Sequence, residues 1–132
     1  MHIEFTPTRL VADAGDGVLA GKLKSYQGGE PQPEGRQHMA LGGNTETTLF
    51  RLVREYKCQT VPMRLDGPTL KKWHAFAASV AAGEFFTFDG LGTAASPDDP
   101  RQVQLKFGSF KQPQRKAGRI FVFSFTIVEF VT

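Results

Sequence analysis

The side chains that most often carry chemistry are few in this chain and far apart in sequence. The three histidines, His2, His38 and His74, lack the short spacing typical of a zinc-binding pair. His74 lies at the edge of an apolar helical stripe, where we expect a partly exposed helix histidine. Cys58 has no nearby base in sequence, so we expect a small core residue and not a nucleophile. The sequence therefore predicts no catalytic residue and no metal ligand.

The acidic residues that could form an acid–base pair all lie in segments marked by glycine or proline. Asp in such segments is an ordinary turn residue, and the EF-hand calcium-loop pattern is absent. Gly42-Gly43-Asn44 is glycine-rich but lacks the Lys-Ser/Thr pair and the following helix of a phosphate-binding loop. We expect turn-forming acids, no cofactor and no enzyme activity. These acids are Asp13, Asp16, Asp89, Asp98 and Asp99.

The charge balance is mildly basic, with a formal net charge of +3 and a pI near 9.2. The cations are scattered, apart from Lys71-Lys72 and a run that comprises Lys111, Arg115, Lys116 and Arg119. A nucleic-acid-binding protein usually concentrates its charge on one face, so the balance argues against affinity-driven binding of nucleic acid. The run could meet phosphate, but a solvated hairpin tip is its ordinary interpretation.

The 132 residues, of which 40% are apolar, suffice for one domain with one hydrophobic core. A single cysteine cannot form an intramolecular disulfide, which favours a reducing compartment. The first ten residues include Glu4 and Pro7 and do not resemble a signal peptide. No segment has the roughly 18 apolar residues of a membrane span, so we expect synthesis and folding in a cytoplasm without membrane insertion.

The apolar periodicity predicts a mainly β protein with one helix. Pro68 fits the first helical position, Asp66 or Gly67 the cap, and Gly83 the stop. On this helix Leu70, Trp73, Ala77 and Val80 should form the face that packs on a sheet. Strands are expected at residues 2–6, 18–26, 45–65, 84–89, 101–107 and 119–131. A change of phase within residues 45–65 predicts a bulge or bend near Thr60–Pro62.

The last of these strands is the strongest, and it is apolar on both faces. Phe121, Phe123, Phe125 and Ile127 line one face, and the other face is half apolar. Such a strand needs cover on both sides from the helix, a second sheet or another subunit. Most of the 12 Phe lie in the second half of the chain, which should therefore build the core. We expect a core of Leu70, Trp73, Val80, Phe121, Phe123 and Phe125.

Three segments read as loops. Residues 27–44 hold five Gly and two Pro, and so long a connection is uncommon in a compact domain unless it is functional or disordered. We expect a mobile loop there that can order against a neighbouring subunit. Residues 91–100 form a polar loop, and residues 111–118 a basic hairpin loop.

The order of features from about Thr45 onward resembles the minor tail and distal tail proteins of long-tailed bacteriophages, including the phage lambda minor tail protein M type. A strand pair leads to the helix Leu70-x-x-Trp73-x-x-Phe76 and then to Gly83-Glu84-Phe85-Phe86-Thr87-Phe88-Asp89. A polar loop, a strand with Val103-x-Leu105-x-Phe107, a basic turn and a last strand ending Phe125-Thr126-Ile127-Val128-Glu129-Phe130 follow. The resemblance covers the last two thirds of the chain as a pattern of elements, and the first third matches only loosely.

The resemblance implies a β-sandwich or barrel flanked by a helix, related to tail-tube proteins, as part of a virion tail. Six copies would form a homo-oligomeric ring that joins the tail tube to the tail-tip proteins and lets DNA pass through its lumen. The family has no shared catalytic or metal residue to assign to this chain. Two alternatives remain open: a tail-tube or tail-completion subunit of the same fold, and a small soluble β-barrel that binds an apolar ligand in a Phe-lined interior.

Overall fold

The structure is a computed structural model that describes residues 1–39, 43 and 45–131, with only the backbone described at residues 36, 38, 39, 45–51 and 131. The described residues form ten strands, one α-helix and the 3₁₀ turn η1 (Val11–Asp13). The helix is α1 (Gly67–Ser79). The strands are β1 (His2–Glu4), β2 (Val18–Ala20), β3 (Leu23–Gly28), β4 (Gln32–Met39), β5 (Thr45–Thr60), β6 (Met63–Arg64), β7 (Phe86–Asp89), β8 (Arg101–Leu105), β9 (Lys111–Lys116) and β10 (Ile120–Val131).

All the described strand pairs are antiparallel and belong to one sheet, with the order β2-β1-β7-β8-β10-β5-β3. Three further strands lie off this path: β4 pairs with β5, and β6 and β9 both pair with β10. The sheet is bent, so side chains from its two halves meet: the rings of Phe88 on β7 and Phe125 on β10 lie 6.1 Å apart. The prediction of a mainly β fold with one helix is confirmed. Of the two expected forms, sandwich or barrel, the closed barrel does not form, because the strands at the two ends of the described path, β2 and β3, do not pair with each other.

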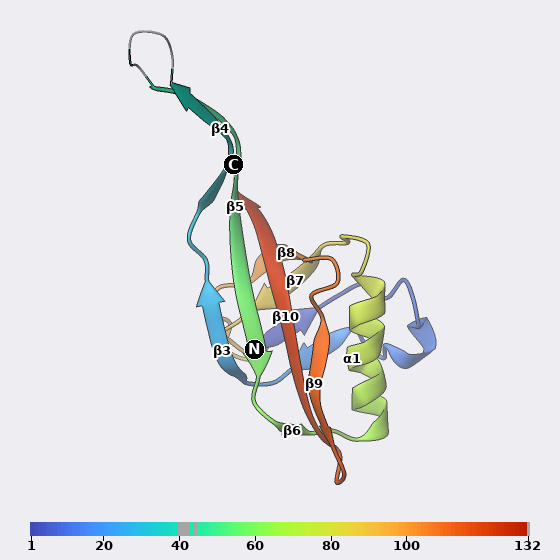
Figure 1. Ribbon diagram of the computed structural model, residues 1–132. Helices are drawn as coiled ribbons and strands as arrows, with labels where there is room; N and C mark the ends of the chain where they lie inside the picture. Colours follow the sequence, from blue (N-terminus) through green and yellow to red (C-terminus); the bar gives the residue numbers. More distant parts are fainter. Residues whose placement is uncertain (40–42, 44, 132) are drawn as a thin grey trace.

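Helix α1 covers one side of the bent sheet, as Figure 1 shows. Asp66 is its N-cap, and its carboxylate accepts a hydrogen bond of 2.8 Å from the Thr69 N–H. Trp73, Phe76 and Val80 are the buried residues of its stripe. The predicted face was wrong in one position, because Phe76 faces the core where Ala77 was expected. Leu70 contacts the core but is only partly buried.

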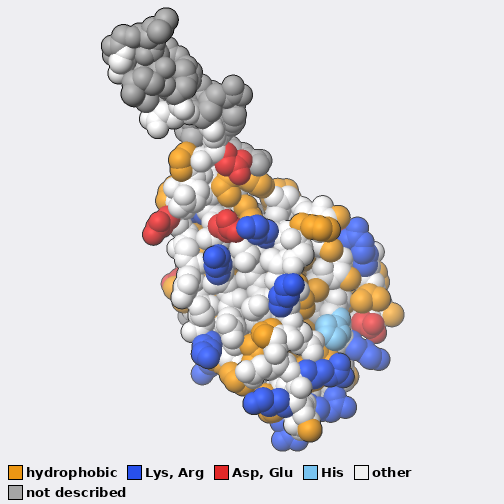
Figure 2. Space-filling view, viewed as in Figure 1, with side chains coloured by type: hydrophobic (Ala, Val, Ile, Leu, Met, Phe, Trp, Pro, Cys, Tyr) orange, Lys and Arg blue, Asp and Glu red, His pale blue; other side chains and the backbone are white. Residues whose placement is uncertain are grey.

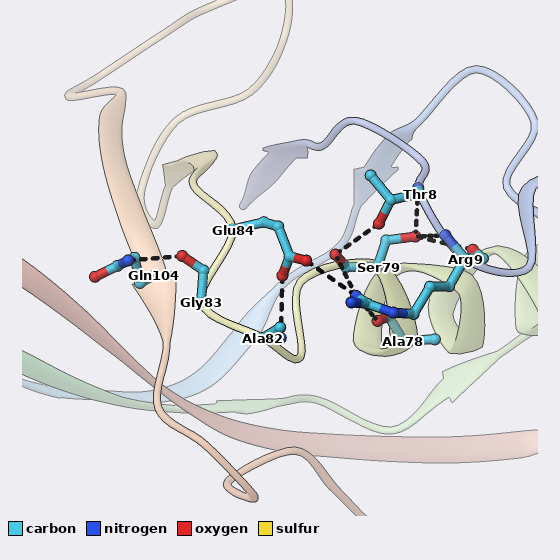
Figure 3. Close-up of polar contacts among 8 residues, drawn as sticks. All are labelled: Thr8, Arg9, Ala78, Ser79, Ala82, Gly83, Glu84 and Gln104. Carbon is cyan, nitrogen blue, oxygen red and sulfur yellow. Dashed lines mark hydrogen bonds and ion pairs between the residues drawn. The ribbon is translucent and has the colours of Figure 1, made fainter.

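The chain after β1 is tied to the end of this helix by a group of hydrogen bonds (Figure 3). The Ser79 hydroxyl is fully buried, accepts from the N–H groups of Thr8 and Arg9 at 3.1 and 3.2 Å, and donates to the Arg9 carbonyl at 2.9 Å. The Arg9 guanidinium donates to the Ala78 carbonyl and to Glu84, both at 3.0 Å. A cation at this position also suits the negative end of the helix dipole. These contacts fix the N-terminal segment against α1.

The core holds aromatic side chains from the helix and from both halves of the sheet. Trp73 stacks on Phe123, and Phe76 meets Phe86 and Phe125 edge to face. The prediction that the second half of the chain builds the core was incomplete. The N-terminal segment also contributes buried residues, namely Ile3 on β1, Phe5 just after it and Leu19 on β2.

Two predicted loops are paired strands. Residues 32–39 form β4, which pairs along β5 from Gln32 opposite Val53 to Met39 opposite Thr45. Residues 40–42 and 44 of the expected mobile loop lie outside the described part of the chain. Residues 111–116 form β9 along β10, so the hairpin turn is confined to residues 117–119. In the same region Phe107, expected on an apolar strand face, lies beyond the end of β8 and is 89% exposed.

Candidate assembly surfaces

The histidines do not come together as a metal site. His2 is buried on β1 with its Nε2 3.0 Å from Glu4 Oε1, and His74 on α1 has its Nε2 3.1 Å from Gln112 Oε1. His38 belongs to β4, and its side chain lies outside the described residues. In the part of the chain that the structure describes, no three His, Cys, Asp or Glu side chains gather as a metal ion would require.

Cys58 lies in the core, as the sequence predicts, with 3% of its surface exposed. Burial raises the pKa of its thiol to about 12. At neutral pH the side chain is therefore a protonated thiol, which is a poor nucleophile and a good small apolar filler.

The acidic residues named from the sequence shape turns. Asp89 is buried, and its carboxylate accepts hydrogen bonds from the N–H groups of Gly92, Asp98 and Asp99 at 2.8, 2.9 and 3.3 Å. Burial alone would raise the pKa of Asp89, but these N–H groups outweigh it and hold the pKa below its usual value. Asp16 instead bonds Lys72 at 2.9 Å. The loop at residues 91–100 is thus organised around one carboxylate.

The most distinctive feature of the molecule is an arm made of β4 and the first half of β5. Among the described residues, β10 pairs with β5 from Leu52 to Gln59, and β3 pairs with β5 from Tyr56 to Thr60. From Leu52 back to Thr45, β5 pairs with β4 in a two-stranded ribbon. Figure 1 shows this ribbon projecting away from the rest of the sheet. Glu34, Gly35 and Gln37 on β4 are exposed. A two-stranded ribbon of this kind is only marginally stable in water unless it packs on something.

Two glycines let the chain pass from β3 to the arm without leaving the edge of β5. Gly28 and Gly29 both have positive φ, 106° and 87°, a backbone conformation that favours glycine. A Cβ on Gly28 would lie 2.1 Å from the Glu55 carbonyl oxygen, and one on Gly29 would lie 2.8 Å from the Tyr56 ring. β3 and β4 therefore lie end to end along one long strand.

β3 and β4 together form an edge that no described strand covers. Each pairs with β5 on one side only. Such an edge presents backbone N–H and C=O groups that can pair with a strand from another chain. Pro33, which cannot donate a hydrogen bond to a ladder, is tolerated at an edge of this kind.

At the base of the arm an ion-pair cluster closes the end of the core. The Arg101 guanidinium lies 3.1 Å from Glu129 Oε1 and 2.7 Å from Asp99 Oδ2, and it donates to the Tyr56 hydroxyl at 3.1 Å. Tyr56 in turn stacks on Tyr26 with ring centroids 5.4 Å apart. Strands β3, β5, β8 and β10 are therefore held together where the arm begins, so the arm extends from a firm base.

The basic residues named from the sequence, Lys111, Arg115, Lys116 and Arg119, are all exposed on β9 and its turn. The structure adds Arg64, which sequence reasoning missed. Arg64 on β6 lies opposite Ile120 of β10, and Lys116 of β9 lies opposite the same residue on the other side. Figure 2 shows Lys and Arg side chains gathered at this end of the molecule, away from the arm. No local sequence signal predicts that Arg64 joins the run, because the pairing is long-range.

Comparison with known proteins finds no family model that matches this chain and no curated protein that matches its sequence. Within the described residues, no helix is both long and apolar enough to cross a membrane.

Proposed function

We propose that this protein is a structural subunit of a bacteriophage tail, and that its copies assemble into a ring joining the tail tube to the tail tip. The proposal combines the resemblance of the last two thirds of the chain to minor tail and distal tail proteins with the surfaces described above. The neighbours are further copies of the chain together with tail-tube and tail-tip proteins, and DNA passes through the lumen. A tail-tube or tail-completion subunit of the same fold is the nearest alternative.

The projecting β4–β5 ribbon is the observation that carries the proposal. From Leu52 toward Thr45 no other described strand joins the ribbon, and a two-stranded ribbon by itself is only marginally stable. Packing on a neighbouring subunit would supply that stabilisation. In a ring such a contact is heterologous, because the arm of one copy meets a different surface of the next.

The open β3–β4 edge and the exposed apolar side chains support the same proposal. The edge offers main-chain hydrogen bonds to a neighbouring strand. Leu91 and Phe107 are 74% and 89% exposed, and large apolar side chains of this kind are common in contact surfaces between subunits. No catalytic group is needed for such a role.

The soluble ligand-binding barrel is less well supported. The sheet does not close, and its interior is filled by the rings of Trp73, Phe76, Phe88, Phe123 and Phe125. A carrier of an apolar ligand would need an enclosed cavity in that position.

Negative-stain imaging of the purified protein, combined with its mass by light scattering, tests the proposal. Rings of about six copies with a central hole are expected, since heterologous contacts that close by rotation give rings. A monomer at all concentrations that binds an apolar fluorescent probe saturably, at one probe per chain, would overturn the proposal in favour of the ligand-binding barrel.

A further inference from the structure

The end of the molecule opposite the arm carries four cations around the tip of the β9–β10 hairpin, which we call the basic end: Arg64, Arg115, Lys116 and Arg119. Arg64 and Lys116 flank Ile120 in one row across β6, β10 and β9. Residues directly opposite one another in an antiparallel pair point to the same face of the sheet. With strands about 4.8 Å apart, the Cα atoms of Arg64 and Lys116 lie about 10 Å from each other.

The other two cations lie on the opposite face of the hairpin, toward helix α1, because neighbouring residues of a strand point to opposite faces. Arg115 lies in the next row, opposite Phe121, with its guanidinium 5.8 Å from the centre of the Phe121 ring. Arg119 is in the turn, and its carbonyl accepts a hydrogen bond from the Leu65 N–H. A surface groove between the hairpin and α1 is lined by Leu70, Phe121 and residues 115–119. Arg115, Lys116 and Arg119 therefore border this groove, and Arg64 lies on the other face of the same hairpin end.

Three of these four cations have no carboxylate partner within the described chain. No ion pair links Arg64, Arg115 or Lys116 to a described Asp or Glu, in contrast to Arg9, Lys72, Arg101 and Lys106, and they share this lack with isolated lysines such as Lys57 and Lys71. The one acid that interacts with the group is Asp66, which attracts Arg119 while also capping α1. A formal net charge of +3 for the whole chain conceals this local excess.

We infer that the basic end is a binding surface for the phosphodiester backbone of a nucleic acid. Three of its cations are Arg, whose planar guanidinium can bind phosphate in a bidentate manner. An acidic surface on a second copy is a poorer partner, because Asp16, Glu55, Glu84, Asp99 and Glu129 already pair with cations of their own chain. The surface has no exposed aromatic side chain for base stacking, since Phe121 is buried, so recognition is through the backbone and independent of sequence.

This inference does not depend on the proposed ring, because one subunit presents the whole surface. Binding is measured by fluorescence anisotropy of a labelled duplex DNA of mixed sequence, titrated with the full chain at salt concentrations from 50 to 200 mM. With four phosphate contacts, log K should fall against log salt with a slope of about −3.6.

The test variant is Arg64→Gln with Lys116→Gln, and the control is Lys57→Gln with Lys106→Gln. Both variants remove two positive charges. Lys57 lies opposite Thr126, and the Lys106 N–H donates to the Thr126 carbonyl, so the control residues are about 20 Å along β10 from Ile120. The test variant should reduce the slope by about two and weaken binding at 50 mM salt by about tenfold or more. The control should keep the wild-type slope. Lys116→Gln with Arg119→Asn is a second test variant with the same expected loss, and Asn tolerates the positive φ of Arg119.

The inference is overturned if the wild-type protein does not bind the duplex, or if test and control variants lose the same slope. Poly-glutamate at equal charge concentration is the competitor that distinguishes the classes of partner. If poly-glutamate displaces the labelled duplex as effectively as unlabelled DNA does, the partner of the basic end is an acidic protein and the inference is overturned. A ring that forms without binding DNA would leave the proposed assembly standing and remove only this inference.

Discussion

The Trp73 indole stacks on the Phe123 ring with centroids 4.6 Å apart and planes 15° from parallel. Both residues are fully buried, and the contact joins α1 to β10. Trp73→Ala should lower the free energy of unfolding by about 3–5 kcal/mol, because it leaves a large cavity. A chemical-denaturation curve followed by circular dichroism measures this. An unchanged midpoint would show that Trp73 is not part of the core.

Trp73→Phe separates packing from polarity at the same position. The Trp73 Nε1–H is buried and has no hydrogen-bond acceptor in the described structure, so replacing the indole by a phenyl ring removes an unsatisfied donor as well as some volume. We expect Trp73→Phe to cost less than half as much as Trp73→Ala. Equal losses for the two variants would indicate that the indole N–H has a partner.

Ser79→Ala should destabilise the fold by about 1–3 kcal/mol, because it leaves the partly buried Thr8 and Arg9 N–H groups without the acceptor that the buried Ser79 hydroxyl provides. The exposed Ser96 is the matched control, and Ser96→Ala should stay within about 0.5 kcal/mol of the wild type. Thermal unfolding of both variants measures the difference. Equal stability of the two variants would mean that the hydrogen bonds of Ser79 to Thr8 and Arg9 contribute nothing to the free energy of unfolding.

Cys58 should resist thiol reagents at pH 8 in the native protein and react once the protein is unfolded. Its folded pKa of about 12 lies above the value near 8.5 of a free thiol. The stability carried by the neutral thiol is therefore complete below about pH 8.5 and is lost as the pH rises toward 12. Cys58→Ala should flatten this alkaline loss, measured by denaturant titrations at pH 8 and pH 10.5. Native labelling as fast as that of the unfolded chain would contradict the buried position.

Asp89→Asn should destabilise the protein at neutral pH, because an amide group cannot accept all the N–H groups that the carboxylate accepts. The folded pKa of Asp89 is lowered, so its stabilisation is present above the ordinary carboxyl pKa and is lost as the pH falls below it. The penalty of Asp89→Asn should therefore shrink between pH 5 and pH 3. Asp98→Asn, at an exposed position, is the control and should stay within about 0.5 kcal/mol of the wild type at neutral pH.

The sequence predicted the elements whose signals are local. The Asp66 cap with Pro68 marks the start of α1, and the alternation from Phe121 to Ile127 marks β10, because each pattern depends only on near neighbours. The break after Thr60 was also predicted correctly, since β5 ends there and β6 begins at Met63. Phe76 and Ala77 lie three and four residues after Trp73, and both spacings fit one face of a helix, so the spacing alone does not decide which of the two is buried.

β4 and β9 were missed because they carry no apolar alternation. Each is an edge strand with exposed side chains, and each contains a proline, Pro33 in β4 and Pro113 in β9. Such segments are strands only because β5 and β10 offer them a backbone partner, which is a tertiary effect. The basic end was missed for the same reason, since Arg64 reaches Lys116 only through the register of β6 and β9 on β10.

The central claim is that the β4–β5 arm mediates assembly, and a shortened arm tests it most directly. Gly35 lies opposite Leu49, so replacing residues 36–48 by Asn-Gly closes the ribbon with a two-residue turn and leaves the core untouched. Light-scattering mass is measured for both proteins over a wide concentration range, with thermal unfolding as the check on folding. We predict that the wild type reaches multiples of 14.6 kDa and that the folded, shortened variant remains a monomer. Equal masses for the two proteins at every concentration would contradict the account.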